Sequence, residues 1–413
     1  MDKSSNLKIN EDKLMKKAPD KKRRLKKRLI CFGILLGFMV GMYLTIVYSD
    51  IPFIAKWRTI YIETAMTTNS HQWLATLFFP QSVIDEVMAK YEQNTKEQKK
   101  ISSKWDENEL DNEANDFFEK YWELDTALFR KYLEDNSTLT NKGYENILIE
   151  DFEEKENLKT VNGDPILVID TANNLILIKI EGEGYQGKLA IVKNPEQVEL
   201  AKSESLGSYG QEAGSFGETN DALLVINASG FKDVDGVGTG GQVKGSLIID
   251  GVDYGHPNGG DWKFCGLKKN NLMYITNYSS DIVEDYRWAI EFYPALIADG
   301  VSAVDGTYGM GIQPRSAIGQ TKSGDILLLV IDGRQPGHSL GCTVADCEQI
   351  LSNYNAYQAM NLDGGSSSVM WYNGEYITKS SSVSGLGRYM PDAFIVNKVQ
   401  DEIVIDAIPG NSR

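Results

Sequence analysis

Residues 359–377 read AMNLDGGSSSVMWYNGEYI, in which two apolar runs flank an aspartate, two glycines and three serines. The run that ends at Leu362 is typical of a buried strand. Glycine allows a positive φ or a close approach of the backbone to a ligand, and hydroxyl groups with bare backbone N–H groups suit an anion or a sugar. A turn built on the Asp-Gly pair is the alternative. The stretch therefore predicts either a turn or a binding loop at a strand end.

Three other predicted strands also carry polar residues at their ends. The strand before ASGF ends at Asn227, the strand in RSAIG begins at Arg315, and VIDGR ends in Asp332, Gly333 and Arg334. Functional sites are often built on loops that a rigid scaffold holds. Together with the aspartate of the first loop, these ends supply two carboxylates and two arginines. Such a set suits an anionic substrate whose bond is broken by acid–base or nucleophilic chemistry.

Each of these residues also has a purely structural interpretation. Asp332 can cap a tight turn with the glycine that follows it, since Asp-Gly is a common turn pair. Arg334 can be a surface cation, and Arg315 can pair with an acid at a strand edge. Histidine is a common acid or base catalyst, but we interpret His338 as a loop histidine without a catalytic role.

The charge of the chain is divided unevenly between its start and the rest. The net charge of the 413 residues is −16, and residues 1–28 carry 12 Lys and Arg against 4 Asp and Glu, a net of +8. The remainder is therefore at −24, which argues against nucleic acid as a partner of the body. A basic end suits the anionic surface of a membrane.

An uncharged apolar segment, LICFGILLGFMVGMYLTIVY, follows this basic end at residues 29–48. Twenty helical residues span about 30 Å, the thickness of a bilayer core. The preceding lysines and arginines predict a cytoplasmic N-terminus and an outward-facing body. A cleaved signal peptide is the alternative, but the run is long for one and lacks a clear small-x-small cleavage site. We therefore expect a signal anchor at residues 29–49.

The rest of the chain divides by pattern into a helical zone and a strand-rich zone. Residues 50–160 show helical spacing, with helices expected in QSVIDEVMAKYEQ and in NDFFEKYWELDTALFRKYLEDN, and are interpreted as a membrane-proximal stalk. Residues 161–400 contain short apolar runs bounded by Gly, Asn or Asp, and one helix over residues 343–355 with Thr343 as its N-cap. The pattern predicts an α+β fold, a mixed β-sheet catalytic domain with few helices, followed by a tail at 401–413.

Cysteine and histidine are too few to suggest a disulfide framework or a metal centre. One cysteine lies in the apolar segment, and the body has Cys265, Cys342 and Cys347, an odd number. We expect these three to be free thiols. The three histidines of the chain and the cysteines lack zinc spacing, so no metal and no cofactor are expected.

Four motifs taken in order resemble the phosphodiester glycosidase family. They are RSAIG, VIDGRQ, AMNLDGGSSSVM and GRYMPDAFIV, within residues 160–400. The family's Asn-Gly-Phe element, usually NAGFF or similar, appears here as NASGF at residues 227–231, and this departure bears on the roles carried over to Asn227 and Phe231. The anchor and the helical zone lie outside the resemblance.

The resemblance implies cleavage of the bond between an anomeric carbon and a phosphodiester oxygen. The leaving phosphate ester is a weak base that needs little protonation, while its charge is well held by arginine forks. Asp332 and Asp363 are implied as catalytic carboxylates. The implied contacts to sugar or phosphate are Asn227, Arg315, Gly333, Arg334, Asn361, Gly364, Gly365, Ser366 and Arg388.

From these observations we expect a single-pass membrane enzyme with an extracellular glycosidase domain. Its substrate would be a sugar-1-phosphodiester of a cell-envelope polysaccharide or glycopolymer, hydrolysed or transferred, as in exopolysaccharide biosynthesis. The alternative is a non-catalytic glycan-binding module that tethers envelope polymer. A peptidase is disfavoured because GGSSS lacks the strand–elbow–helix context of Gly-x-Ser-x-Gly.

Overall fold

The computed structural model describes residues 21–68, 71–105, 114, 116–233, 238–258 and 262–399. Most of the predicted basic tail and the predicted C-terminal tail at 401–413 lie outside these residues. The chain forms two compact units, residues 1–59 and residues 60–413. The part of the predicted stalk from residue 60 onward therefore shares a unit with the strand-rich zone.

The first helix is long and apolar enough to cross a membrane. Helix α1 covers Lys21–Tyr48, and its segment Arg24–Tyr48 contains an 18-residue stretch with a mean hydropathy of 2.3 and few buried residues. A helix of this length measures about 40 Å at 1.5 Å per residue. The chain then enters α2 (Pro52–Met66) at a proline, a residue well suited to the first helical position. The expected apolar anchor helix is thus present, as a candidate membrane span or signal helix.

One predicted helix is wrong, because residues 115–136 form two short helices, α5 (Phe117–Lys120) and α6 (Thr126–Asp135). The chain leaves α5 where Val161 N–H donates to the Glu123 carbonyl at 2.8 Å and the buried Glu123 carboxylate pairs with Lys193 at 2.5 Å. Asp125 then accepts from two N–H groups of the first turn of α6, at 3.0 Å each. Tertiary contacts and a new N-cap therefore override the helical pattern. The other helices of this zone are α3 (Trp73–Phe78) and α4 (Gln81–Gln98).

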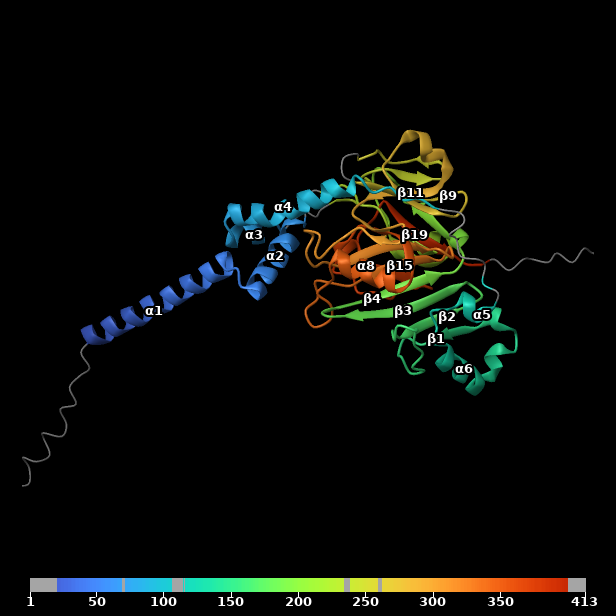
Figure 1. Cartoon of the computed structure of the whole chain (residues 1–413), viewed down its shortest axis with the longest axis horizontal. Helices are drawn as coiled ribbons and strands as arrows, with labels where there is room; N and C mark the ends of the chain where they lie inside the picture. Colours follow the sequence, from blue (N-terminus) through green and yellow to red (C-terminus); the bar gives the residue numbers. More distant parts are fainter. Residues whose placement is uncertain are drawn as a thin grey trace, which may run out of the picture. The chain divides into compact units, whose positions relative to one another are not determined.

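A nine-stranded antiparallel sheet forms the centre of the second unit (Figure 1). In spatial order its strands are β1 (Leu148–Glu150), β2 (Ile166–Asp170), β3 (Leu175–Gly182), β4 (Tyr185–Val192), β15 (Ile326–Ile331), β14 (Arg315–Thr321), β16 (Ala356–Asn361), β12 (Ala295–Ala298) and β13 (Val301–Ser302).

Two five-stranded antiparallel sheets accompany it. The first has the order β10 (Met273–Thr276), β9 (Lys263–Lys268), β11 (Tyr286–Phe292), β7 (Leu247–Ile249) and β8 (Val252–Asp253). The second has the order β18 (Glu375–Tyr376), β17 (Met370–Tyr372), β6 (Ala222–Asn227), β19 (Asp392–Asn397) and β5 (Val198–Lys202).

The remaining helices are α7 (Ala213–Thr219), α8 (Val344–Asn353) and the short 3-10 turns η2 (Ser137–Thr140), η3 (Tyr144–Asn146), η4 (Pro195–Gln197), η5 (Ser280–Asp285) and η6 (Gly365–Ser367). The predicted α+β class is confirmed.

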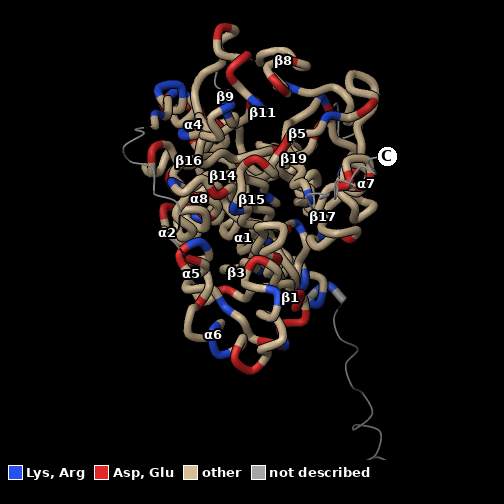
Figure 2. The backbone as a smooth tube through the Cα atoms, turned by 90° about the vertical axis from the view of Figure 1, so that its right-hand side faces the viewer, with Lys and Arg blue, Asp and Glu red and all other residues tan. Residues whose placement is uncertain are grey.

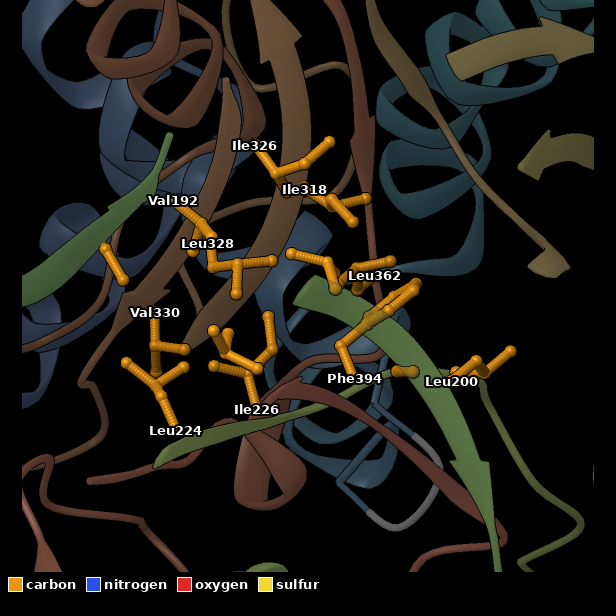
Figure 3. Packing of buried hydrophobic residues seen from close by; sticks show 14 of the residues in the cluster. Val192, Leu200, Leu224, Ile226, Ile318, Ile326, Leu328, Val330, Leu362 and Phe394 are labelled. Atoms are coloured by element: carbon orange, nitrogen blue, oxygen red, sulfur yellow. The ribbon is translucent and has the colours of Figure 1, made fainter. Parts of the chain in front are cut away.

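Strand β15 shows why the central sheet is apolar on both faces. Its residues 326, 328 and 330 pack into the core shared with the two smaller sheets, and residues 327, 329 and 331 pack into the core on the other face. Figure 3 shows Leu328 and Val330 close to Leu224 and Ile226 of β6. The six-residue run ILLLVI is therefore continuous because alternate side chains enter two different cores.

Helix α8 covers the second face of the central sheet. Thr343 accepts from Asp346 N–H at 3.1 Å and the Asp346 carboxylate accepts from Thr343 N–H at 2.7 Å, so the predicted N-cap is confirmed as a capping box. The thiols of Cys342 and Cys347 are free and buried, with their sulfur atoms 3.4 Å apart. Around the sheets, Asp and Glu are spread over the peripheral helices and loops (Figure 2).

The register brings several motif-bearing strand ends to one place. Arg315 at the start of β14 pairs with Ile331 at the end of β15, and Ala317 pairs with Asn361 at the end of β16. In the neighbouring sheet Asn227 at the end of β6 pairs with Ala393 near the start of β19. Antiparallel pairing thus gathers strand ends that are far apart in the sequence.

Candidate active site

The loop after β16, residues 362–368 and here called the Asp363 loop, depends on its two glycines. Gly365 has φ +64°, a region that glycine enters without steric cost. A Cβ on Gly364 would lie 2.9 Å from the Pro314 carbonyl oxygen, which already accepts from Gly365 N–H at 3.0 Å. The loop therefore lies against the residues just before β14 at a distance that only glycine allows.

Asn227 holds this loop from the neighbouring sheet. Its Nδ2 donates to the Asp363 carbonyl oxygen at 2.6 Å, and its Oδ1 accepts from Ser316 Oγ at 2.6 Å and from Val369 N–H at 3.3 Å. The residue is buried. Asn227 thus joins β6, β14 and both ends of the Asp363 loop, and its side chain is engaged within the protein.

The Asp363 carboxyl group is partly buried, and both burial and nearby positive charges act on its pKa. Removal from water raises the pKa of Asp363 to about 6, while hydrogen bonds from Ser367 and from Gly364 N–H and the positive charges of Arg388 and Lys244 oppose the rise. A carboxyl group with this pKa exchanges its proton close to neutral pH. That property suits a general acid or base.

A second carboxyl group, that of Asp392 at the start of β19, lies close enough to interact with Asp363. Asp392 is fully buried and accepts from Ser229 N–H at 2.8 Å through Oδ1, while its Oδ2 has no hydrogen-bond partner among the described residues. Burial raises the pKa of Asp392 to about 7, and the charge of Asp363 contributes in the same direction. The two carboxyl groups therefore disfavour each other's ionised form.

Arg334 brings a guanidinium group to the Asp363 loop. The residue is exposed overall and has φ +58°, and its Nη2 donates to Gln313 Oε1 at 2.6 Å. A Cβ on Gly365 would lie 3.2 Å from Nη2 of Arg334, so the guanidinium group lies on the loop backbone. Desolvation at this end of the side chain and then the charge of Arg315 lower the pKa of Arg334, whereas Asp363 raises it.

Arg315 occupies a different environment although it shares a neighbourhood with Arg334. It is 3% exposed, and its guanidinium group donates to the backbone carbonyls of Met310, Gly311 and Cys342 at 3.1–3.4 Å. Burial lowers the pKa of Arg315. Its charge acts on the site, but these donors are directed at the protein's own carbonyl groups.

Arg388 is a further cation whose charge acts on Asp363. Its Nη1 is 3.0 Å from Asp233 Oδ2, and its guanidinium carbon lies 5.2 Å from the centre of the Phe231 ring. The pKa of Asp233 is lowered: burial acts to raise it, but the hydrogen bond from Arg388 and other interactions that favour the carboxylate outweigh burial. Arg388 therefore ties the chain before β19 to the loop after β6.

The loop after β15, residues 332–341 and here called the Asp332 loop, is built differently. The Asp332 carboxylate accepts from Lys379 N–H at 2.9 Å and lies 2.8 Å from Nε2 of His338. Burial raises the pKa of Asp332, and its bonds with His338 and Lys379 N–H act against that rise. A Cβ on Gly333 would lie 2.8 Å from Pro314 N, which explains the glycine. Asp332 therefore orients an imidazole.

Two more of the predicted contacts lie on the Asp363 loop or directly before it. Asn361 is buried, its Nδ2 donates to the Tyr293 carbonyl at 2.8 Å, and its Oδ1 has no hydrogen-bond partner among the described residues. Ser366 is partly exposed, and its carbonyl oxygen accepts from Ser380 Oγ at 2.8 Å.

Three residues near Asp363 were not identified from the sequence. Asp392 follows a proline at a strand start inside the motif GRYMPDAFIV, so a strand-end carboxylate was there to be found. Ser367 is in the serine run but was not separated from its neighbours. No sequence motif around Lys244 indicates a functional role, because only the tertiary fold brings it near Asp363. Within the described ranges, no group of three or more His, Cys, Asp or Glu side chains is arranged to hold a metal ion.

Comparisons with known proteins were made for sequence and for structure. Part of the chain is 26% identical over 200 residues to the SPbeta prophage-derived uncharacterized protein YomE of Bacillus subtilis (strain 168). That alignment covers 46% of this chain and 30% of YomE, so the chain spans less than a third of that relative's length.

Two solved structures are similar in part. The catalytic domain of zebrafish N-acetylglucosamine-1-phosphodiester alpha-N-acetylglucosaminidase, auto-inhibited by its pro-peptide, shares 20% identity with a TM-score of 0.46, over 54% of this chain and 82% of that one. A hypothetical protein from Synechocystis shares 15% identity with a TM-score of 0.42, over 56% of this chain and 63% of that one.

The family comparison covers the part of the chain that carries the Asp332 and Asp363 loops. The phosphodiester glycosidase model matches residues 220–397, a segment that begins before β6 and ends with β19. The resemblance seen in the motifs is thereby confirmed for residues 220–397, which match the phosphodiester glycosidase family model.

Proposed function

We propose that this protein is a membrane-anchored extracellular glycosidase that cleaves a sugar-1-phosphodiester of a cell-envelope polysaccharide or glycopolymer. The observation that carries the proposal is the environment of the Asp363 carboxyl group, whose pKa is raised to about 6 and which interacts with the charges of Arg334, Arg388 and Lys244. An acid–base group surrounded by cations suits a reaction at an anionic ester.

Arg334 is the proposed phosphate ligand. A phosphodiester carries one negative charge, and the planar guanidinium fork can bind two of its oxygens at once. The Arg334 residue is exposed and its guanidinium group has one described hydrogen-bond partner, Gln313, whereas the donors of the buried Arg315 face backbone carbonyls. We therefore assign direct phosphate contact to Arg334 and long-range charge stabilisation to Arg315. Arg388, held by Asp233, contributes its charge as well.

Asp363 is the proposed catalytic carboxyl group. In hydrolysis, the bond between the anomeric carbon and the phosphate oxygen breaks and the phosphate monoester leaves with the electron pair. A bond then forms between the anomeric carbon and either water oxygen or the carboxylate, and in the second case water then cleaves the glycosyl ester, which releases the sugar and regenerates the carboxylate. In the first case the proton of the attacking water passes to Asp363. Asp392 keeps a proton to higher pH than an ordinary aspartate and so limits the negative charge behind Asp363.

Asp332 is proposed to act through His338. The pair resembles the arrangement in which a carboxylate orients an imidazole and fixes its tautomer. The His338 side chain is 23% exposed and that of Asp332 is 7% exposed, so the imidazole is the member of the pair that can reach a substrate. The earlier interpretation of His338 as an inactive loop residue is replaced in this proposal.

The remaining residues are proposed to shape the site. Asn227 holds the Asp363 loop in place, and Gly333, Gly364 and Gly365 permit the close backbone packing around Pro314. The free Oδ1 of Asn361 and the partly exposed Ser366 are the candidate contacts to sugar hydroxyl groups.

The extracellular location and the envelope substrate are supported by the N-terminal part of the chain. A candidate span precedes the domain, and the cluster of lysines and arginines before it favours an N-terminus in the cytoplasm. A sugar phosphodiester in reach of such a domain belongs to the cell envelope. A glycan-binding module without catalysis is the second candidate, since Asp, Asn and glycine-rich loops also bind sugars.

A panel of sugar-1-phosphodiesters separates the two functions. The full chain in detergent micelles is incubated with each compound, and free sugar and phosphate monoester are measured. Release of both products in equal amounts supports the glycosidase. Saturable binding of envelope polymer with no release from any compound supports the binding module and contradicts the enzyme.

A further inference from the structure

The last turn of helix α2 and Thr67, the residue directly after it, contact a loop that leads into β14, residues 307–313. Thr64 Oγ1 accepts from Ile312 N–H at 3.0 Å, and Thr67 Oγ1 accepts from Gln313 Nε2 at 2.7 Å. Thr67 also donates, to the Glu63 carbonyl at 2.7 Å. Gly311 has φ +60°, and a Cβ there would lie 2.3 Å from Thr64 Oγ1, so a glycine is needed for this contact.

The contact continues from Gln313 to the candidate site. The Gln313 side chain donates from Nε2 to Thr67 and accepts at Oε1 from Arg334 Nη2 at 2.6 Å. Its backbone is fixed as well, because Gln313 and Cys342 exchange two hydrogen bonds of 3.0 and 3.1 Å. The side-chain amide of Gln313 is therefore hydrogen-bonded through both its nitrogen, to Thr67, and its oxygen, to Arg334.

The same loop also holds the second arginine. Arg315 Nη2 donates to the carbonyls of Met310 and Gly311, at 3.2 and 3.1 Å. These carbonyls belong to the segment that rests on Thr64 and Thr67. The environments of both arginines thus depend on one loop, and that loop is docked on a helix that lies before the matched domain of residues 220–397.

We propose that the end of helix α2 belongs to the active-site machinery, with Thr67 and Gln313 as positioning residues that hold the Arg334 guanidinium group on the Asp363 loop for a phosphodiester. The role as a phosphate ligand rests on the function proposed above. The hydrogen-bonded chain from Thr67 through Gln313 to Arg334 does not depend on it.

Positioning matters because Arg334 is exposed. A free arginine side chain samples many rotamers, and binding a ligand in one of them costs conformational entropy. The bond from Gln313 fixes part of the side chain before substrate arrives. Loss of that bond is expected to weaken substrate binding about tenfold, in line with one hydrogen bond to a charged group. The chemistry at the anomeric carbon is expected to change little, so KM should rise more than kcat falls.

The test uses the full chain with Thr67→Val, Gln313→Ala and the control Thr68→Val. Thr68 is next to Thr67, but its hydroxyl donates to the Ala65 carbonyl at 2.8 Å and accepts from His71 N–H at 3.1 Å, both close in sequence. For the phosphodiester substrate, we expect KM to rise about tenfold in Thr67→Val and Gln313→Ala and to stay unchanged in the control. Thr67→Ser keeps the hydroxyl group and should restore the wild-type KM, which separates positioning from misfolding.

A second measurement needs no substrate. Phenylglyoxal modifies accessible, unrestrained guanidinium groups, and peptide mass spectrometry gives the rate at Arg334 alone. We expect faster modification in Thr67→Val and Gln313→Ala than in wild type, Thr67→Ser or Thr68→Val. Unchanged modification in Thr67→Val and Gln313→Ala would overturn the proposal. If wild type turns over no phosphodiester, the proposed function fails, and the modification rates still decide whether α2 positions Arg334.

Discussion

The Asp332 loop and the Asp363 loop share an Asp-Gly pair after an apolar strand but have different surroundings. Each follows a buried apolar strand, β15 or β16, and each begins with Asp-Gly next to the same segment around Pro314. Asp332 is 6% exposed and is tied to His338 and to Lys379 N–H, whereas Asp363 is partly exposed and is influenced by Arg388 and Lys244. An Asp-Gly pair at a strand end therefore does not define a role.

The difference arises from what the fold places opposite each carboxyl group. The Asp332 loop returns on itself, so that the imidazole six residues later reaches the carboxylate. The Asp363 loop instead runs past the strand ends of the neighbouring sheet, where Asn227 and Asp392 lie. One loop supplies its own partner, and the other is completed by residues that are distant in sequence.

The largest expected effect is that of Asp363→Asn. Removal of a group that acts as base or nucleophile should lower kcat by about a thousandfold, within the range for such groups. Binding of a substrate analogue should persist, since the amide has nearly the same shape. Initial rates and analogue titrations on the same preparation measure both. A binding module without catalysis would instead show altered affinity alone.

The two arginines provide the next contrast. Arg334→Ala should raise KM about 10- to 100-fold with little change in stability, as expected for loss of a charge-assisted hydrogen bond at an exposed side chain. Arg315→Ala should instead destabilise the fold by about 1–3 kcal/mol, because buried carbonyl groups lose their donors. Steady-state kinetics and denaturant unfolding distinguish these outcomes. A large rise of KM in Arg315→Ala with intact stability would reverse the two assignments.

A smaller effect is expected at the Asp332 loop. Asp332→Asn should lower the rate about tenfold, since the imidazole remains but loses its orienting carboxylate. If Asp332 acts through His338, the double variant with His338→Ala should be no slower than His338→Ala alone. Rates that multiply in the double variant would show that Asp332 has an independent role.

The smallest effect concerns stability and pH. The pKa of Asp363 is raised to about 6 in the folded chain, against about 4 for an unfolded aspartate, so its ionised form opposes folding. This destabilising contribution is absent below about pH 4, grows as the pH rises to about 6 and is complete above that. Asp363→Asn should therefore gain stability relative to wild type across this window, as measured by thermal unfolding at several pH values. A difference that does not vary with pH would contradict the raised pKa.

Parts of the fold could be predicted because their signals are local. The apolar runs of β2, β3, β4, β6, β15, β16 and β19 and the Thr343 cap gave the strand-rich domain and the helix α8. The single helix predicted over residues 115–136 was wrong because Glu123 is fixed by Val161 and Lys193, which are remote in the sequence. A helical pattern does not report such contacts.

The same limit applies to the candidate site. The motifs located Asp332, Arg334 and Asp363, because an Asp-Gly pair at the end of an apolar run can be recognised from the sequence alone. They did not show that Asp332 faces His338, or that the carboxyl neighbour of Asp363 is Asp392. Those relations come from the pairing of β6 with β19 and of β14 with both β15 and β16.

The most direct test of the contrast between the two loops is chemical rescue. Asp363→Ala and Asp332→Ala in the full chain are assayed on one sugar-1-phosphodiester, with and without added azide or formate. We predict that Asp363→Ala is nearly inactive and regains turnover with the small anion, which takes the place of the missing carboxylate, while Asp332→Ala keeps part of its activity and is not rescued. Rescue of Asp332→Ala, together with near wild-type turnover by Asp363→Ala, would contradict the account and move the catalytic carboxylate to the Asp332 loop.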